Sequence, residues 1–145
     1  MPGLEEIGVK VVPMQADGNA RALLNEIASL LQDLLNTGEG GSIDLARIPL
    51  TEEDYDLLDD VLGEGEVHAS IETLGASEVV ETGVAGVWWI THYNADDEVM
   101  AEFIEVSYCP EILLAPREDV QEGLEALQAR LLEERLNHKG NNHGG

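Results

Sequence analysis

Hydrophobic residues follow a helical period in the first third of the chain and a period of two in its middle. From about residue 20, apolar residues recur three and four positions apart, which predicts an amphipathic helix over 20–36. Its apolar stripe comprises Leu23, Ile27, Leu30, Leu31, Leu34 and Leu35. The Gly-rich stretch 38–42 that follows has the composition of a flexible connector.

A second helix is predicted over 52–62. Thr51 is followed three residues later by Asp54, a spacing typical of a helix N-terminus with a capping box. Gly63 is suited to the backbone conformation that often ends a helix. The apolar stripe of this helix comprises Tyr55, Leu58, Val61 and Leu62.

Four strands are predicted in the middle of the chain, because apolar and polar residues alternate there and β-branched and aromatic residues are frequent. They cover 66–73, 77–82, 86–93 and 99–108. The short turns between them favour an antiparallel meander. A last helix is predicted over 117–137, and its stripe comprises Val120, Leu124, Leu127 and Leu131.

The order of these elements predicts an α+β fold, in which an antiparallel sheet of about four strands has two helices before it and one long helix after it. All three helices are expected to pack on one face of the sheet. We expect a weakly structured arm over 1–17, with a short strand at 7–12, and a single domain over 18–137. The polar stretch 138–145 is expected to be a disordered tail.

Composition excludes several classes of protein. The chain has 145 residues, with 30 acidic against 7 basic side chains and a formal net charge of −23. Such charge repels nucleic acids and anionic lipids, whereas the 43% of hydrophobic residues is too high for a disordered acidic segment. No apolar run approaches the roughly 20 residues that span a bilayer, and no secretion signal is recognisable. We therefore expect a soluble cytoplasmic protein that binds neither nucleic acid nor membrane; the oligomeric state is not indicated.

The charges are distributed unevenly. Between Arg47 and Arg117 there is no Lys or Arg, while 17 Asp and Glu residues lie in that interval. One interpretation is a solvated acidic surface that aids solubility. The other is a docking face for a basic partner, which the negative field would attract.

Candidate catalytic residues are few. His68, His92 and Cys109 could form a carboxylate–imidazole metal site or a thiol–imidazole pair if the fold brought them together. A single cysteine is more often a small buried hydrophobic residue, and the two histidines are more often ordinary residues of a sheet surface. Gly63 and Gly65 do not form a phosphate loop, because Glu64 and Glu66 would lie where phosphate binds.

Trp88 and Trp89 are adjacent on a predicted strand, so their side chains point to opposite faces. One can anchor the core. The other is either covered by a helix of the same chain or exposed, and an exposed tryptophan is a favoured anchor for a partner.

Three blocks of residues resemble a known family. They are Leu62-Gly63-Glu64-Gly65-Glu66-Val67, Glu81-Thr82-Gly83-Val84-Ala85-Gly86-Val87-Trp88, and Ile104-Glu105-Val106 followed by Pro110-Glu111-Ile112. Together they resemble the conserved domain of the HupH/HyaF-type accessory proteins of nickel–iron hydrogenase operons, over about residues 48–130. Better-known members are longer, and the position of Trp89 is often basic in them.

The resemblance implies a non-catalytic, chaperone-like assembly factor without a bound cofactor. Its partner would be a hydrogenase subunit precursor or another maturation factor, and the iron–sulfur small subunit, before twin-arginine export, is favoured. We hypothesise that an acidic face of the sheet captures a basic stretch of that precursor. The residues expected to bind the partner are Gly63, Gly65, Glu66, Glu72, Glu81, Gly86, Trp88, Trp89, Glu105 and Pro110.

Two alternatives remain open. One is a small metal-handling or thiol-dependent enzyme that uses His68, His92 and Cys109. The other is an acidic interaction domain unrelated to hydrogenase.

Overall fold

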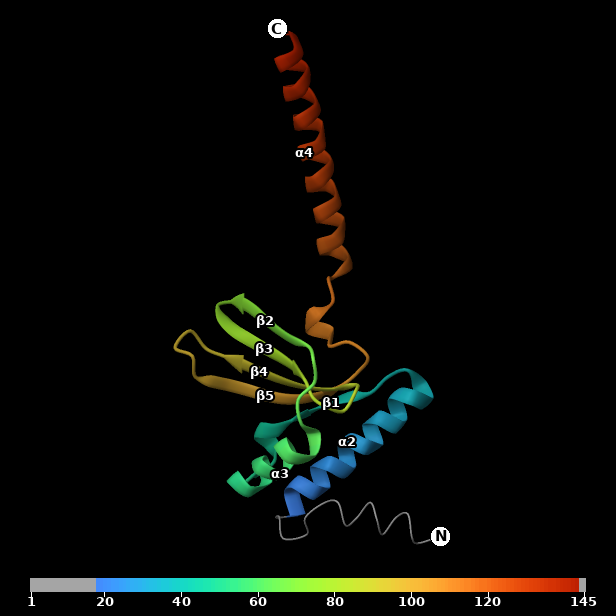
Figure 1. Ribbon diagram of the computed structural model, residues 1–145, viewed down its shortest axis with the longest axis vertical. Coiled ribbons are helices and arrows are strands. Elements are labelled where there is room, and N and C mark those ends of the chain that lie inside the picture. The colour runs from blue at the N-terminus through green and yellow to red at the C-terminus, as the bar shows by residue number, and fades with distance from the viewer. Residues whose placement is uncertain (1–17, 144–145) are drawn as a thin grey trace. The chain divides into compact units, whose positions relative to one another are not determined.

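The computed structural model describes residues 18–143, apart from the side chains of residue 73 and residues 140–143, and it has the predicted α+β fold (Figure 1). The described residues form two compact units, which meet at Pro110 in the sequence and are considered separately. The predicted arm over 1–17, with its possible strand at 7–12, lies outside the described residues.

The first unit contains a five-stranded antiparallel sheet with the strand order β1-β5-β4-β3-β2. The meander of four strands is confirmed, with small shifts at the strand ends. Its strands are β2 (His68–Thr73), β3 (Gly75–Glu81), β4 (Val87–Tyr93) and β5 (Val99–Val106).

A fifth strand, β1 (Gly41–Asp44), begins within the stretch predicted to be a flexible connector and pairs with β5. The glycines explain the difference. A Cβ atom on Gly40 would lie 2.1 Å from the carbonyl oxygen of Val106, so a residue without a side chain is needed for the two backbones to approach. The same glycines that make this stretch look like a linker therefore permit a strand.

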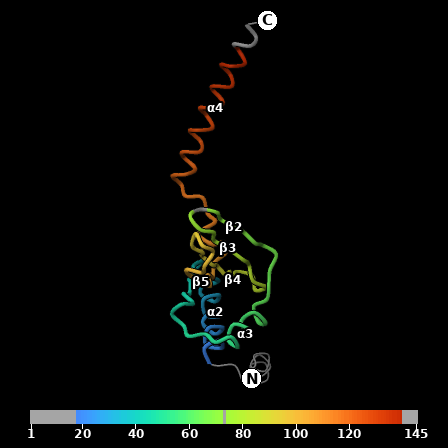
Figure 2. The backbone as a smooth tube through the Cα atoms, turned by 90° about the vertical axis from the view of Figure 1, so that its left-hand side faces the viewer, coloured from blue at the N-terminus to red at the C-terminus, as the bar shows by residue number. Residues whose placement is uncertain are grey.

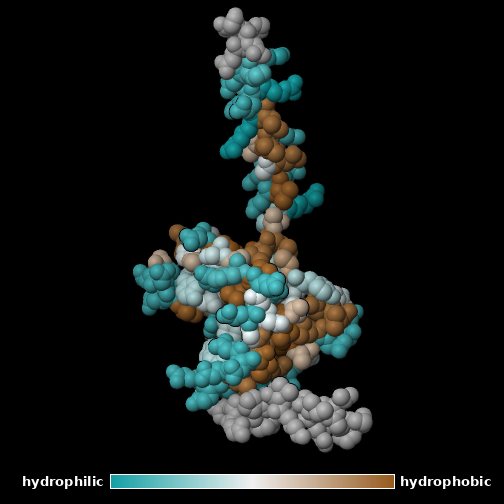
Figure 3. Space-filling view, viewed as in Figure 1, coloured by the Kyte–Doolittle hydropathy of each residue, from teal (hydrophilic) through white to brown (hydrophobic). Residues whose placement is uncertain are grey.

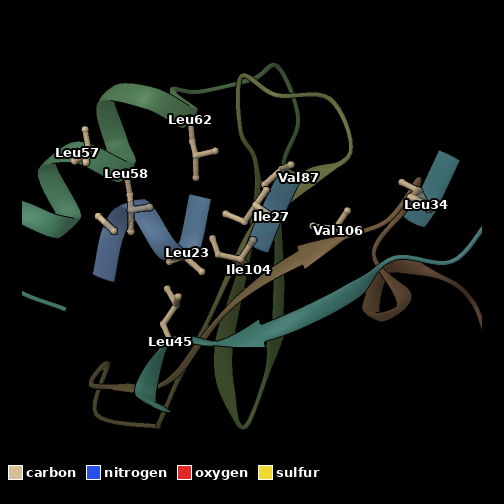
Figure 4. Packing of buried hydrophobic residues seen from close by; sticks show 11 residues of the cluster. Leu23, Ile27, Leu34, Leu45, Leu57, Leu58, Leu62, Val87, Ile104 and Val106 are labelled. Atoms are coloured by element: carbon tan, nitrogen blue, oxygen red, sulfur yellow. The ribbon is translucent and has the colours of Figure 1, made fainter. Parts of the chain in front are cut away.

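Two helices, α2 (Gly18–Thr37) and α3 (Glu52–Leu62), lie next to each other beside the sheet (Figures 1 and 2). The predicted stripes largely form the core, although Leu35 is exposed. The side chains of this core cluster come from both helices, β4, β5 and the 3₁₀ turn Leu45–Arg47, and most are labelled in Figure 4. They are Ala20, Leu23, Ile27, Leu34, Leu45, Leu57, Leu58, Leu62, Val87, Ile104 and Val106.

The buried carboxylate of Asp54 joins the beginnings of the two helices. Thr51 and Asp54 form the predicted capping box, in which Thr51 Oγ1 accepts from the Asp54 backbone N–H and Asp54 Oδ2 accepts from the Thr51 N–H. Asp54 Oδ1 also accepts from the backbone N–H of Ala20 at 3.2 Å, in the first turn of α2. One carboxylate thus satisfies backbone donors at two helix N-termini.

The second unit contains a 3₁₀ turn (Glu111–Leu113) and α4 (Arg117–His143). This helix continues beyond residue 137, through part of the stretch predicted to be a disordered tail. The predicted stripe of Val120, Leu124, Leu127 and Leu131 lies on this helix, and these side chains are 49–57% exposed. Periodicity identifies an amphipathic helix but not the surface that covers it. No helix among the described residues is long and apolar enough to cross a membrane.

Candidate functional site

The parts of the resembling blocks that belong to the first unit, residues 62–67, 81–88 and 104–110, meet at one end of the sheet. The backbone N–H of Gly65 donates to Glu81 O at 2.8 Å, and that of Gly83 donates to Leu62 O at 2.8 Å. On the other side, the N–H of Ser107 donates to Gly86 O at 2.9 Å. We call this region, comprising residues 63–67, 81–88 and 105–110, the loop end of the sheet.

Glu81 holds the loop that connects α3 to β2. Its Oε1 atom accepts hydrogen bonds from the backbone N–H groups of Glu66 at 3.0 Å and Val67 at 3.2 Å. Gly65 permits this contact, because a Cβ atom there would lie 2.5 Å from Thr82 O and 2.6 Å from Glu81 Oε1. Glu81, expected to contact a partner, therefore has a structural partner within the chain.

The loop between β3 and β4 is organised around the buried hydroxyl of Thr82. Its Oγ1 atom accepts from the Val84 N–H at 3.1 Å and lies 2.9 Å from Val87 O. Gly86 has a φ angle of +89°, which glycine adopts without strain. These contacts give the second block of the resemblance a defined loop conformation.

Trp88 lies between two carboxylate residues of neighbouring strands, because it pairs with Glu81 on β3 and with Glu105 on β5. All three side chains therefore belong to the same face of the sheet. The Trp88 indole N–H donates to Ser107 O at 3.1 Å, and Ser107 Oγ donates to Glu105 Oε2 at 2.8 Å. Only 7% of Trp88 is exposed, so it anchors this face rather than presenting a free ring.

Trp89 points to the opposite face, toward the helices. Its indole N–H donates to Glu102 Oε2 at 2.9 Å, and the Tyr55 hydroxyl from α3 donates to Glu102 Oε1 at 3.3 Å. The rings of Tyr55 and Trp89 are 6.3 Å apart. Burial raises the pKa of Tyr55, and the neighbouring carboxylate of Glu102 raises it further. Trp89 is thus covered from α3, and neither tryptophan is an exposed anchor.

Most of the residues expected to bind a partner lie at the loop end. These are Gly63, Gly65, Glu66, Glu81, Gly86, Trp88, Glu105 and Pro110. Trp89 lies on the other face, and Glu72 is placed further along β2, where it pairs with Ala76. Glu66 and Glu72 are exposed, whereas Glu81 and Glu105 are half-buried and Pro110 is buried.

The structure does not bring the candidate catalytic residues together. His68 pairs with Val80 next to Trp89, and His92 lies on the face of Trp88, so the two imidazoles are on opposite faces. His92 Nδ1 and Ser77 Oγ are 2.7 Å apart. His92 pairs with Ala101 near the start of β5, whereas Cys109 is exposed beyond its end. Within the part of the chain that the structure describes, no group of three or more His, Cys, Asp or Glu residues could hold a metal ion.

One feature of the site region was not predicted. An open hollow of about 480 Å³ lies on the face that carries His68, which contacts Glu78. It is lined by His68, Ala76, Glu78, Val80, Thr91, Tyr93 and Asp97. Alternation along β2, β3 and β4 places most of these residues on one face, but only the strand register shows that they are neighbours.

Acidic side chains surround the loop end. Asp59 and Asp60 are exposed near the end of α3, just before the loop end begins. Glu64 and Glu66 are exposed on the loop that follows this helix. The interval without Lys or Arg, from Arg47 to Arg117, includes the whole loop end. The surface is therefore suited to a cationic segment and unsuited to an anionic ligand.

Comparison with known proteins gives a consistent result. Residues 18–133 match the family "HupH hydrogenase expression protein, C-terminal conserved region". The chain is 36% identical over 117 residues to the hydrogenase expression/formation protein HupH of Rhodobacter capsulatus, a match that covers 79% of this chain and 42% of the relative. It is 30% identical over 104 residues to HupH of Rhizobium leguminosarum bv. viciae, covering 72% and 37%. The chain thus spans about two-fifths of the length of these relatives.

A solved structure is similar as well. The hydrogenase expression protein HupH from Thiobacillus denitrificans is 46% identical and superposes with a TM-score of 0.76, covering 81% of this chain and 98% of that one. The family match covers most of the chain and includes the whole loop end. The chain therefore belongs to the HupH hydrogenase expression protein family and contains its C-terminal conserved region.

Proposed function

We propose that this chain is a non-catalytic assembly factor in the maturation of nickel–iron hydrogenase. In this proposal it binds a hydrogenase subunit precursor, with the iron–sulfur small subunit favoured, through the acidic loop end of the sheet. The observation that carries the proposal is the convergence of the family's residue blocks on one acidic surface. The names of the relatives, hydrogenase expression/formation proteins, supply the process.

The alternative of a metal-handling or thiol-dependent enzyme has less support. It needs His68, His92 and Cys109 within reach of one another, but the histidines lie on opposite faces of the sheet. Cys109 is separated from His92 by most of the length of β5, where Ala101 to Val106 alone spans about 17 Å. A binding role requires no such constellation.

The half-buried and exposed carboxylates have different roles in this proposal. Glu81 and Glu105 are hydrogen-bonded within the chain and shape the surface around Trp88. Asp60, Glu64 and Glu66 are exposed and supply the negative charge that a basic stretch of the precursor meets. Attraction of this kind speeds association and weakens as salt is raised.

The experiment compares two triple variants that change the net charge equally. The test variant is D60N/E64Q/E66Q at the loop end. The control variant is E26Q/D33N/E39Q, which neutralises three exposed acids on or next to α2. Both variants raise the net charge of −23 by three, so only the position of the lost charge differs.

Each variant is titrated against the small-subunit precursor of a nickel–iron hydrogenase by calorimetry. The proposal expects the test variant to bind about 3–100-fold more weakly than the unmodified chain, since each of the three exposed charges contributes about 0.2–1 kcal/mol. The control variant is expected to bind within about twofold of it. Equal affinity of the two variants would contradict docking at the loop end.

A further inference from the structure

A long helix with an exposed apolar seam remains without a role in the proposed function. Apolar side chains gather along one side of α4, with hydrophilic ones around them (Figure 3). Val120, Leu124, Leu127 and Leu131 each keep about half of their surface exposed. Their spacing of four, three and four residues is the repeat of a helix that pairs with another helix.

Charged residues continue this repeat at both ends of the apolar seam. Arg117 lies three residues before Val120, and Glu134 lies three residues after Leu131. The full seam therefore has a basic residue at its start, four apolar residues in its middle and an acidic residue at its end. This order distinguishes the two ways in which identical helices can pair.

We propose that α4 pairs with α4 of a second copy of this chain in antiparallel orientation and so forms a homodimer. When two such helices are centred between Leu124 and Leu127, each Leu124 meets Leu127 of the other copy, and each Val120 meets Leu131. The same register brings each Arg117 opposite Glu134 of the other copy. The interface then consists of four apolar layers, with an Arg117–Glu134 ion pair next to them at each end.

Parallel pairing gives the opposite electrostatic result. It sets Arg117 against Arg117 and Glu134 against Glu134, and residues in identical positions repel when they carry the same charge. The rest of the helix has the same preference. Residues 117–125 contain one basic and four acidic side chains, whereas residues 130–139 contain three basic and two acidic ones. Antiparallel pairing places the acidic half of one helix against the more basic half of the other.

The test uses the full chain and measures its mass by sedimentation equilibrium over a range of concentrations. The seam variant L124E/L127E places four carboxylates in the central layers. It is expected to raise the dissociation constant of the dimer by at least about 100-fold. The control L132E/L136E changes two leucines that are equally exposed, at 58% and 61%, but lie off the seam, and it is expected to change the constant by less than about threefold.

Charge reversal tests the orientation. R117E and E134R each turn both end pairs into like charges, and each is expected to weaken the dimer by about 3–30-fold. The double variant R117E/E134R restores opposite charges only in the antiparallel register and is expected to restore the original affinity.

A monomer at every concentration would overturn the proposal. A dimer that survives L124E/L127E would overturn the interface, and a double variant weaker than either single variant would overturn the orientation. Circular dichroism of each variant verifies that the helix content is unchanged.

Discussion

Glu81 Oε1 lies 3.0 Å from the backbone nitrogen of Glu66 and accepts its hydrogen bond, so one carboxylate of the loop end holds the loop that carries another. This relationship separates two kinds of acid that look alike in the sequence. Glu81 has backbone donors and is half-buried, whereas Glu66 is exposed. Their substitutions are expected to have different consequences.

Replacing Glu81 by Ala is expected to destabilise the first unit. The change removes the acceptor of two charge-assisted hydrogen bonds from residues 66 and 67, and we expect it to lower the free energy of unfolding by about 1–3 kcal/mol. Urea denaturation measures the change. E66Q serves as the control and is expected to stay within about 0.5 kcal/mol, because that side chain is exposed. Equal losses in the two variants would show that Glu81 has no special structural role.

Two glycines in different surroundings test the close approach at the loop end. G65A places a Cβ atom 2.5 Å from Thr82 O, a backbone atom that cannot move alone, and we expect a loss of about 1–3 kcal/mol. G123A in α4 meets no atom within 4 Å and is expected to stabilise that helix by about 0.5–1 kcal/mol. Thermal unfolding followed by circular dichroism compares the two. A neutral G65A variant would contradict the described packing of the loop.

Asp54 is expected to be the most sensitive capping residue of the chain's first unit. D54A removes the acceptor for backbone donors of both α2 and α3 at a fully buried position, and we expect a loss of about 2–4 kcal/mol. T51A removes one cap of α3 only and is expected to cost about 1 kcal/mol. Chemical denaturation of both variants tests this order, and a T51A variant less stable than D54A would contradict it.

The hydroxyl of Tyr55 is expected to titrate above the ordinary pKa of a tyrosine, which is about 10. Because the folded-state pKa is raised, the corresponding stability is fully present below about pH 10 and is lost as the pH rises through the folded-state pKa. Spectrophotometric titration of the folded chain measures this pKa, and the Y55F variant identifies the contribution of Tyr55 among the three tyrosines. E102Q is expected to lower the pKa only in part, since burial is the largest cause and the charge of Glu102 is second. A Tyr55 that titrates at its ordinary pKa would contradict the contact.

Much of the fold follows from hydrophobic periodicity, and the exceptions have physical reasons. The capping box of Thr51 and Asp54 is a local pattern and was predicted to the residue. The strand β1 is not predicted, because Gly40 and Gly41 have the composition of a linker; only the pairing of Gly41 with Val106 and the close approach of Gly40 to Val106 O identify a strand there. A pattern of neighbouring residues gives no information on contacts between residues that are far apart in the chain.

In the candidate site, too, some features follow from the local sequence pattern, whereas others depend on contacts between distant residues. Alternation correctly predicted that Trp88 and Trp89 face opposite sides, but the cover of Trp89 depends on Tyr55 from another element. The acidic character of residues 64–66 is visible in the composition. The role of Glu81 is not visible there, because the sequence does not distinguish a glutamate that accepts hydrogen bonds from backbone N–H groups from a glutamate that is exposed to solvent.

The measurement that tests the central claim most directly is calorimetric titration of this chain with the small-subunit precursor of a nickel–iron hydrogenase. The precursor is used with and without its twin-arginine signal segment, each at low and at high salt. We expect binding that requires the signal segment and weakens as salt is raised, because an acidic surface would capture a basic stretch. Absence of binding under all four conditions, or binding that is indifferent to both the segment and the salt, would contradict the proposed role of the loop end.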